Sequence, residues 1–248
     1  MFIDTHCHLS IEDYDDIDKV VKEDIEAGVK KLIVSACTKN TFEEALALAK
    51  KYDSIYVTLG FHPSEVDTTD ADLELLKELL KTDKVVGVGE IGLDYHYGKD
   101  DIDIQKELFE KQLVIAEKLN LPVVIHSRDA VNDTIETLKK HNVKGVIHCF
   151  SGSVETADIY IRLGYKLGIG GVVTFKNSNL YKVVEHVGLD NIVLETDSPY
   201  LAPEPFRGKQ NSSKYIPVIA TKIADILNVS LSEVEDKTTM TASNLFDL

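Results

Sequence analysis

Phe2-Ile3-Asp4-Thr5-His6-Cys7-His8-Leu9 begins as an apolar strand and ends in two histidines separated by one residue. Successive side chains of a strand point to opposite faces, so His6 and His8 project from the same face. Two imidazoles placed in this way can hold one metal ion. Short motifs of this kind also occur by chance, and a pair of ordinary core or surface histidines is the alternative interpretation. The rest of the chain has to decide between the two.

Short β-branched runs alternate along the chain with longer segments of helical period. Strands are predicted at residues 2–8, 31–36, 55–61, 85–90, 123–126, 145–149, 166–170 and 192–195. Helices are predicted at 17–27, 41–51, 73–80, 104–119, 131–140, 154–163 and 180–186, with two more after the eighth strand at 216–227 and 231–246. Eight such alternations predict an α/β fold of the (β/α)8 TIM barrel type. A doubly wound open sheet is the alternative, but it normally has fewer strands, and no GxGxxG follows the first strand.

Composition narrows the class of protein. No linker or change in composition divides the chain, so residues 1–248 are predicted to form a single barrel domain. No signal-peptide pattern opens the chain and no apolar run reaches the roughly 18 residues of a membrane span, so we expect a soluble cytoplasmic protein without a membrane partner. The net charge of −15 argues against a protein that coats duplex nucleic acid. An anionic substrate would need metal ions or a few well-placed cations.

Metal-ligating residue types follow five of the apolar strand bodies. They are His6 and His8 after the first strand, Glu90 after the fourth, His126 after the fifth, His148 after the sixth and Asp197 after the eighth. The carboxyl ends of the strands form the active-site face of such a barrel. Each residue alone could be a satisfied core histidine or a helix cap. Together, without metal, they would be strongly destabilising through desolvation and repulsion. Six ligands are too many for one tetrahedral ion, so the sequence predicts two divalent metal ions with Glu90 between them.

With these motifs the chain resembles the TatD-like metal-dependent deoxyribonucleases of the amidohydrolase superfamily. The resemblance runs through residues 2–9, 60–63, 89–95, 122–130, 148–152 and 195–203. It implies a first metal held by His6, His8 and Asp197, a second held by His126 and His148, and Glu90 between them. It also implies an exonuclease that acts on single-stranded DNA ends. The chain departs from the family pattern at Ser10, Asn132 and Ser212-Ser213, none of which is an expected ligand.

The reaction we expect is metal-assisted hydrolysis of a phosphodiester bond. The ions would lower the pKa of a shared water and hold the phosphate oxygens. Asp197 and Glu90 are the predicted catalytic residues, with Asp197 orienting the water and accepting its proton. Arg128 and Arg207 flank the inferred site, and because a guanidinium suits phosphate, both are assigned to substrate binding rather than to surface salt bridges.

Three more residues just past strand ends are candidates for substrate contact: His62, Asp94 and Tyr95. Tyr95 could stack on a base or simply pack a loop. His62 could touch substrate or a third ion.

Two questions stay open at this stage. Four imidazoles suit zinc, whereas phosphodiester chemistry often uses magnesium or manganese, so the metals could be Zn, Mg or Mn. The substrate is expected to be single-stranded DNA or another nucleic-acid end. Hydrolysis of a small amide, lactone or phosphoester on the same metals is the first rival function, and a catalytically silent metal-binding scaffold is the second. The sequence does not indicate an oligomeric state.

Overall fold

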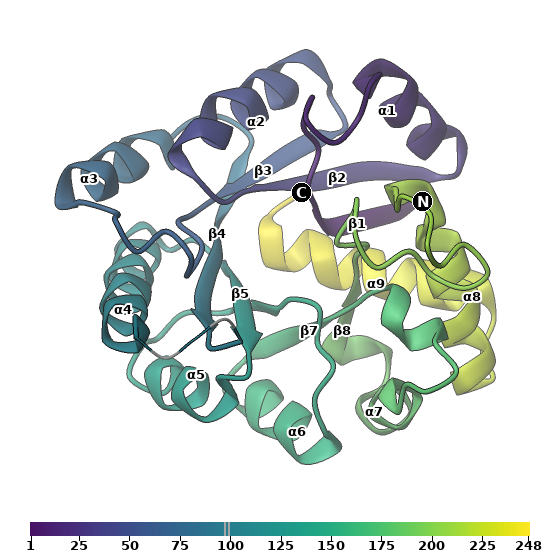
Figure 1. Cartoon of the computed structure of the whole chain (residues 1–248). Coiled ribbons are helices and arrows are strands. Elements are labelled where there is room, and N and C mark those ends of the chain that lie inside the picture. Colours follow the sequence, from purple (N-terminus) through teal and green to yellow (C-terminus); the bar gives the residue numbers. More distant parts are fainter. Residues whose placement is uncertain (97, 99) are drawn as a thin grey trace.

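Eight parallel strands form the centre of the protein in a computed structural model that describes residues 1–96, 98 and 100–248 (Figure 1). Each strand pairs with the next one along the chain. The strands are β1 (Phe2–Cys7), β2 (Val29–Ala36), β3 (Ile55–Leu59), β4 (Val85–Asp94), β5 (Val123–Arg128), β6 (Gly145–Ile147), β7 (Tyr165–Ile169) and β8 (Ile192–Leu194). The predicted (β/α)8 TIM barrel is confirmed.

Helices alternate with the strands and surround them (Figure 1). They are α1 (Ile17–Glu26), α2 (Lys39–Lys51), α3 (Asp70–Leu79), α4 (Ile102–Leu119), α5 (Val131–Leu138), α6 (Val154–Arg162), α7 (Leu180–Val187), α8 (Ile216–Leu227) and α9 (Leu231–Phe246). Short 3-10 helices lie at η1 (Gly171–Thr174), η2 (Leu189–Asn191) and η3 (Ser213–Tyr215). Several helices begin at a capping side chain; Thr38, for example, accepts a hydrogen bond from the Thr41 backbone N–H.

The first and last strands meet through specific hydrogen bonds. The Thr5 hydroxyl donates to the Leu194 carbonyl at 2.9 Å, and the Asp197 N–H donates to the His6 carbonyl at 3.0 Å. The buried Asp4 carboxylate accepts from the Thr196 hydroxyl at 2.6 Å. These bonds bring the end of the chain's first strand beside the segment that carries Asp197.

The barrel interior is layered. Ile33, Val124, Val146 and Val193 are buried together with Ala242, Leu245 and Phe246 of α9, which lies across this end of the barrel (Figure 1). Two positions further along the chain come Ser35 and His126 within β2 and β5, and His148 and Glu195 just past the ends of β6 and β8. An apolar layer next to α9 therefore supports a polar layer at the carboxyl ends of the strands.

Several strand ends differ from the sequence-based prediction. β4 continues past Glu90 to Asp94 and β5 past His126 to Arg128, because these strands stay paired as far as Asp94 and Arg128. Asp94 therefore lies within a strand rather than just past its end. β6 and β8 are shorter than predicted, so His148 and Glu195 follow the last residues of their strands.

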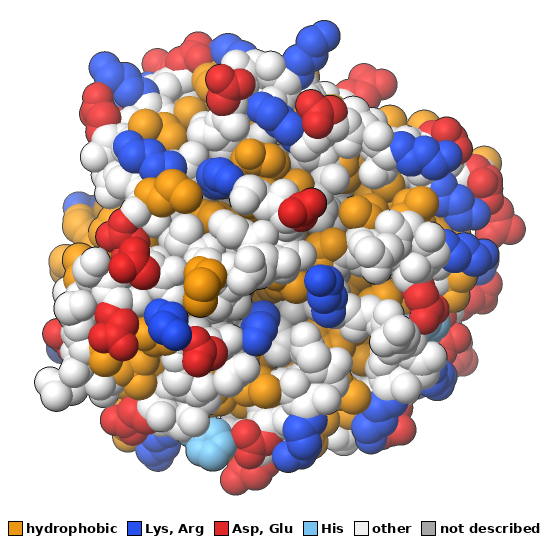
Figure 2. Space-filling view, turned by 180° about the vertical axis from the view of Figure 1, so that it is seen from behind, with side chains coloured by type: hydrophobic (Ala, Val, Ile, Leu, Met, Phe, Trp, Pro, Cys, Tyr) orange, Lys and Arg blue, Asp and Glu red, His pale blue; other side chains and the backbone are white. Residues whose placement is uncertain are grey.

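The surface seen from behind carries basic and acidic side chains interspersed over one face (Figure 2). This pattern does not resemble the continuous basic surface by which a protein would coat a duplex. Across the described parts of the chain, no helix combines the length and apolar character needed to cross a bilayer.

Candidate metal-binding active site

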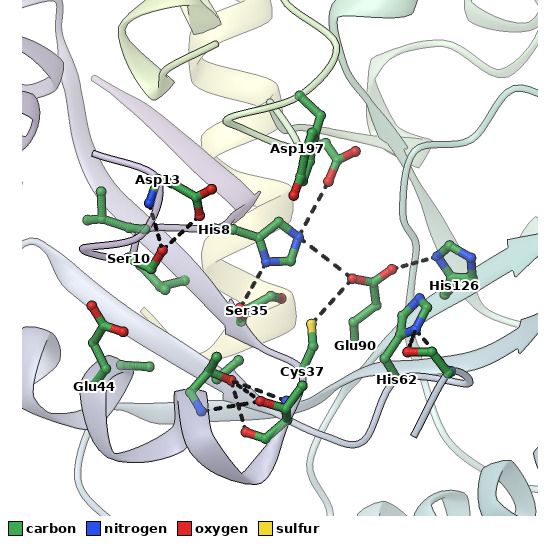
Figure 3. A pocket seen from close by; sticks show the side chains of 18 of the residues that line it. His8, Ser10, Asp13, Ser35, Cys37, Glu44, His62, Glu90, His126 and Asp197 are labelled. Carbon is green, nitrogen blue, oxygen red and sulfur yellow. Dashed lines mark hydrogen bonds and ion pairs between the residues drawn. The ribbon is translucent and has the colours of Figure 1, made fainter. Parts of the chain in front are cut away.

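His6, His8 and Asp197 form the first group of possible ligands. The His6 Nε2 and His8 Nε2 atoms are 3.3 Å apart, and each lies 3.6 Å from Asp197 Oδ1. The two histidines reach this point from β1 and from the residue just after it, as the period of a strand predicts, and Asp197 comes from the loop after β8. In Figure 3 the His8 and Asp197 side chains point toward one another across the cavity.

Glu90 lies between this group and a second one. Its Oε2 atom is 3.5 Å from His6 Nε2 and 3.9 Å from His8 Nε2. Its Oε1 atom is 2.6 Å from His126 Nδ1 and 3.0 Å from His148 Nε2. One carboxylate thus offers one oxygen to each pair of histidines, an arrangement suited to bridging two ions.

The geometry of the first group fits a divalent ion. Four ligand atoms around a tetrahedral zinc ion lie about 3.4 Å apart, given Zn–N and Zn–O distances of about 2.0–2.2 Å. The separations of 3.3 and 3.6 Å in this group match that spacing. The donor atoms, imidazole nitrogens and carboxylate oxygens, are those that bind zinc, magnesium or manganese in proteins. Of the polar side chains in both groups, His6 and Glu90 are almost fully buried, a costly placement that bound cations would offset.

The charges of the groups depend strongly on one another. Burial raises the pKa of Glu90, but the neighbouring His148 and His126 more than offset it and hold that pKa well below its usual range. Burial and the nearby His148 lower the pKa of His6 well below its usual range. Glu90 is therefore ionised and His6 neutral, whereas, despite burial, Glu90 raises the pKa of His148 and, with Asp94, that of His126, so an ion binding there would displace their protons.

Two further residues, Ser35 and Cys37, contact the expected ligands. The Ser35 hydroxyl lies 3.1 Å from His6 Nδ1, and the Ser35 carbonyl lies 3.1 Å from His8 Nδ1. Cys37 donates a thiol hydrogen bond to Glu90 Oε2 at 3.6 Å (Figure 3). Ser35 follows Ile33 on the inner face of β2, so strand alternation was the available signal. Cys37 lies past the strand end and carried none.

A cavity of about 850 Å³ opens over both groups. His62, Asp94 and Arg128, three of the residues predicted to contact substrate, line it together with all the expected ligands except His6. His62 lies against His126, with ring centroids 4.7 Å apart, and burial lowers the pKa of His62 to about 4. His62, Asp94 and His126 also bring three possible ligand atoms within 4.8 Å of one another. Tyr200, which the sequence analysis passed over, stands exposed at the rim.

Two predicted substrate residues do not line this cavity. The Tyr95 hydroxyl donates to Asp133 Oδ2 at 2.8 Å, so the tyrosine packs a loop, which was the alternative interpretation. Arg207, in the loop after β8, makes a cation–π contact with Phe175, which follows η1: its guanidinium lies 4.4 Å from the centre of the ring. Neither contact had a signal in the sequence, because both depend on how loops fold.

The chain is similar to known proteins over nearly its whole length. The family model described as TatD related DNase matches residues 3–247. An uncharacterized metal-dependent hydrolase from Bacillus subtilis, YabD, is 40% identical over 252 residues, which cover 99% of each chain. The uncharacterized metal-dependent hydrolase YcfH from Escherichia coli is 35% identical, covering 99% of this chain and 96% of YcfH. The crystal structure of YjjV, a TatD homologue from Escherichia coli, superimposes with a TM-score of 0.92 at 33% identity and covers 100% of this chain and 98% of its own.

Proposed function

The chain belongs to the TatD-related DNase family of metal-dependent hydrolases, and from this premise we propose that it removes nucleotides from the ends of single-stranded DNA by hydrolysing phosphodiester bonds. The observation that carries the proposal is the placement of Glu90, whose two carboxylate oxygens face two separate pairs of histidines. We assign His6, His8 and Asp197 to one ion, His126 and His148 to a second, and Glu90 to both.

Divalent ions bound there would supply Lewis acidity and lower the pKa of a water molecule toward neutrality. The chain's own residues then have separable tasks. Asp197 turns Oδ1 toward His6 and His8, which leaves Oδ2 to orient the attacking water and accept its proton. Arg128 lines the cavity and is placed to hold a phosphate oxygen. His62, neutral because of its low pKa, can donate or accept a hydrogen bond without adding charge.

A second candidate function is hydrolysis of a small amide, lactone or phosphoester on the same ions. The acidic side chains Glu12, Asp13 and Glu44 also line the cavity and favour a substrate with less negative charge. Asp13 and Glu44 are labelled in Figure 3. A cavity of about 850 Å³ can accept a strand terminus but can also accept a small molecule.

The proposal is tested with metal-stripped protein, re-supplied with Mg²⁺, Mn²⁺ or Zn²⁺, acting on an end-labelled single-stranded DNA oligomer. We expect stepwise, metal-dependent release of nucleotides and a loss of at least roughly 100-fold in kcat for Asp197→Asn. Asp158→Asn, the same chemical change on the surface of α6, should keep wild-type activity. Absence of cleavage with every ion, despite metal binding, would refute the deoxyribonuclease proposal and favour the small-molecule function.

A further inference from the structure

His126 lies between two carboxylates. Its Nδ1 atom faces Glu90 Oε1 at 2.6 Å, and its Nε2 atom faces Asp94 Oδ2 at 3.0 Å. Asp94 is itself fixed, because its Oδ1 accepts from the His96 backbone N–H at 2.9 Å and its own N–H donates to Gln105 at 2.9 Å. The outer nitrogen of His126 is therefore held by a carboxylate that cannot move freely.

His148 shows a similar but looser arrangement with its nitrogens reversed. Its Nε2 atom faces Glu90 Oε1 at 3.0 Å, and its Nδ1 atom, which has no hydrogen-bond partner in the part of the chain that the structure describes, lies in an ion-pair contact 3.5 Å from Glu195 Oε1. Glu195 is completely buried and accepts a hydrogen bond from the Cys149 backbone N–H. Its second oxygen, Oε2, has no hydrogen-bond partner among the described residues. Because burying a carboxylate is costly, its place behind the His148 imidazole indicates that Glu195 interacts with that ring.

Neutral imidazole carries one N–H and one lone pair, so only one nitrogen can bind a metal while the other donates a hydrogen bond. Histidines that bind metal usually donate this second N–H to a carboxylate or carbonyl, which fixes the tautomer and the ring orientation. We propose that Asp94 and Glu195 are positioning residues that hold His126 and His148 in opposite tautomers, so that His126 presents Nδ1 and His148 presents Nε2 toward the same oxygen of Glu90. The inference rests on the proposed metal pair, and it gives Asp94 a role other than the predicted substrate contact.

His126 and His148 come from neighbouring strands at the same level, because Ile125 of β5 pairs with Ile147 of β6. Their rings are nearly parallel, with an interplanar angle of 28° and centroids 5.8 Å apart. The two rings nevertheless turn different nitrogens toward Glu90, and each has a carboxylate on its far side, Asp94 behind His126 and Glu195 behind His148.

Gly168 of β7 makes room for Glu195. A Cβ atom at position 168 would lie 2.0 Å from Glu195 Oε2, so any larger residue there must displace the carboxylate. Gly168→Ala therefore disturbs Glu195 from behind without altering an expected ligand. This variant offers a second route to the same carboxylate.

The first test measures the stoichiometry and affinity of Zn²⁺ binding to the metal-stripped chain by competition with a chelator. The wild type should bind two ions. For Asp94→Ala and for Gly168→Ala we expect affinity at one of the two ions to fall by roughly 10- to 100-fold. Glu195→Gln keeps an acceptor oxygen but loses the charge. Its Zn²⁺ affinity should therefore fall less than that of Gly168→Ala. Asp24→Asn removes a buried carboxylate that contacts none of these histidines and should leave both affinities unchanged.

The second test reads the tautomers directly in the Zn²⁺-loaded wild type, labelled with ¹⁵N-histidine, by long-range ¹H–¹⁵N spectroscopy. The proton should be retained on Nε2 of His126 and on Nδ1 of His148. This measurement depends neither on substrate nor on a variant that must fold.

The outcomes separate the two proposals. If the wild type binds fewer than two ions, the proposed metal pair fails, and this inference fails with it. If two ions bind but the rings carry the same tautomer, or the variants bind Zn²⁺ as the wild type does, the positioning roles are refuted and the metal pair stands.

Discussion

Arg128 and Arg207 differ in where the structure holds them, although both were assigned to substrate binding from the sequence. Arg128 ends β5 and lines the cavity, whereas Arg207 is stacked on Phe175 and does not line it. We predict that Arg128→Ala raises KM for the DNA oligomer by roughly 10- to 100-fold, because a charge-assisted hydrogen bond to phosphate contributes about 1.5–3 kcal/mol. Arg207→Ala should change KM by less than about threefold.

Steady-state kinetics of both variants measure these changes in KM. Arg162→Ala, on the exposed face of α6, is the matched control, because it removes the one remaining arginine of the chain at a site away from the cavity. An Arg207 variant that loses as much affinity as the Arg128 variant would mean that the loop after β8 closes over the cavity when substrate binds.

That the six expected ligands lie close together could be predicted from the sequence for a simple physical reason. Strand alternation and the common level of parallel strand ends are local rules, and they are enough to predict that His6, His126 and His148 meet. Glu195 obeys the same alternation after Val193, but its importance depends on Gly168 of the neighbouring strand leaving space for it. Contacts between strands of that kind are not encoded in either segment alone.

At the scale of elements, the loop after β8 is fastened to helix α1. Asp24 of α1 accepts hydrogen bonds at 2.7 Å from the Ser212 hydroxyl and from the Lys214 backbone N–H. Burial raises the pKa of Asp24 to about 6. The folded chain therefore binds a proton at Asp24 more readily than the unfolded chain. The stability that this proton contributes is present at pH 4 and is lost as the pH rises through about 6.

We predict that Asp24→Asn removes this pH dependence. Each unit of pKa corresponds to about 1.4 kcal/mol, and the unfolded chain is already partly ionised at Asp24 at pH 4, so the free energy of unfolding of the wild type relative to the variant should fall by roughly 2 kcal/mol between pH 4 and pH 7. Urea denaturation at both pH values measures it, and taking the difference between the two proteins cancels the other titrating groups. A difference that stays constant with pH would show that Asp24 titrates normally.

Element boundaries were harder to predict than element order. The apolar body of β4 stops at Glu90, so the sequence indicated an end there, yet hydrogen-bonded pairing with β5 extends the strand to Asp94. Where a strand ends depends on its pairing with the neighbouring strand, so the sequence of β4 alone does not show it. This also explains why Asp94 was expected in a loop and is found in the sheet, behind His126.

At the scale of the whole molecule, the net charge of −15 opposes the approach of a polyanion. The acidic side chains Glu12, Asp13 and Glu44 also line the cavity, so any attraction for DNA is local to the ions and Arg128. The balance between long-range repulsion and local attraction has a measurable consequence, because salt screens the former far more than the latter.

We predict that kcat/KM for a single-stranded DNA oligomer rises by roughly threefold or more when salt increases from 10 to 150 mM at saturating metal. Over this range the Debye length falls from about 30 Å to about 8 Å, which removes most of the repulsion between the chain and a distant strand. A small phosphodiester with a single negative charge is the matched control and should respond much less. A steep fall with salt, as seen when a protein displaces counterions from many phosphates, would contradict the prediction and reveal an extended basic track for the strand.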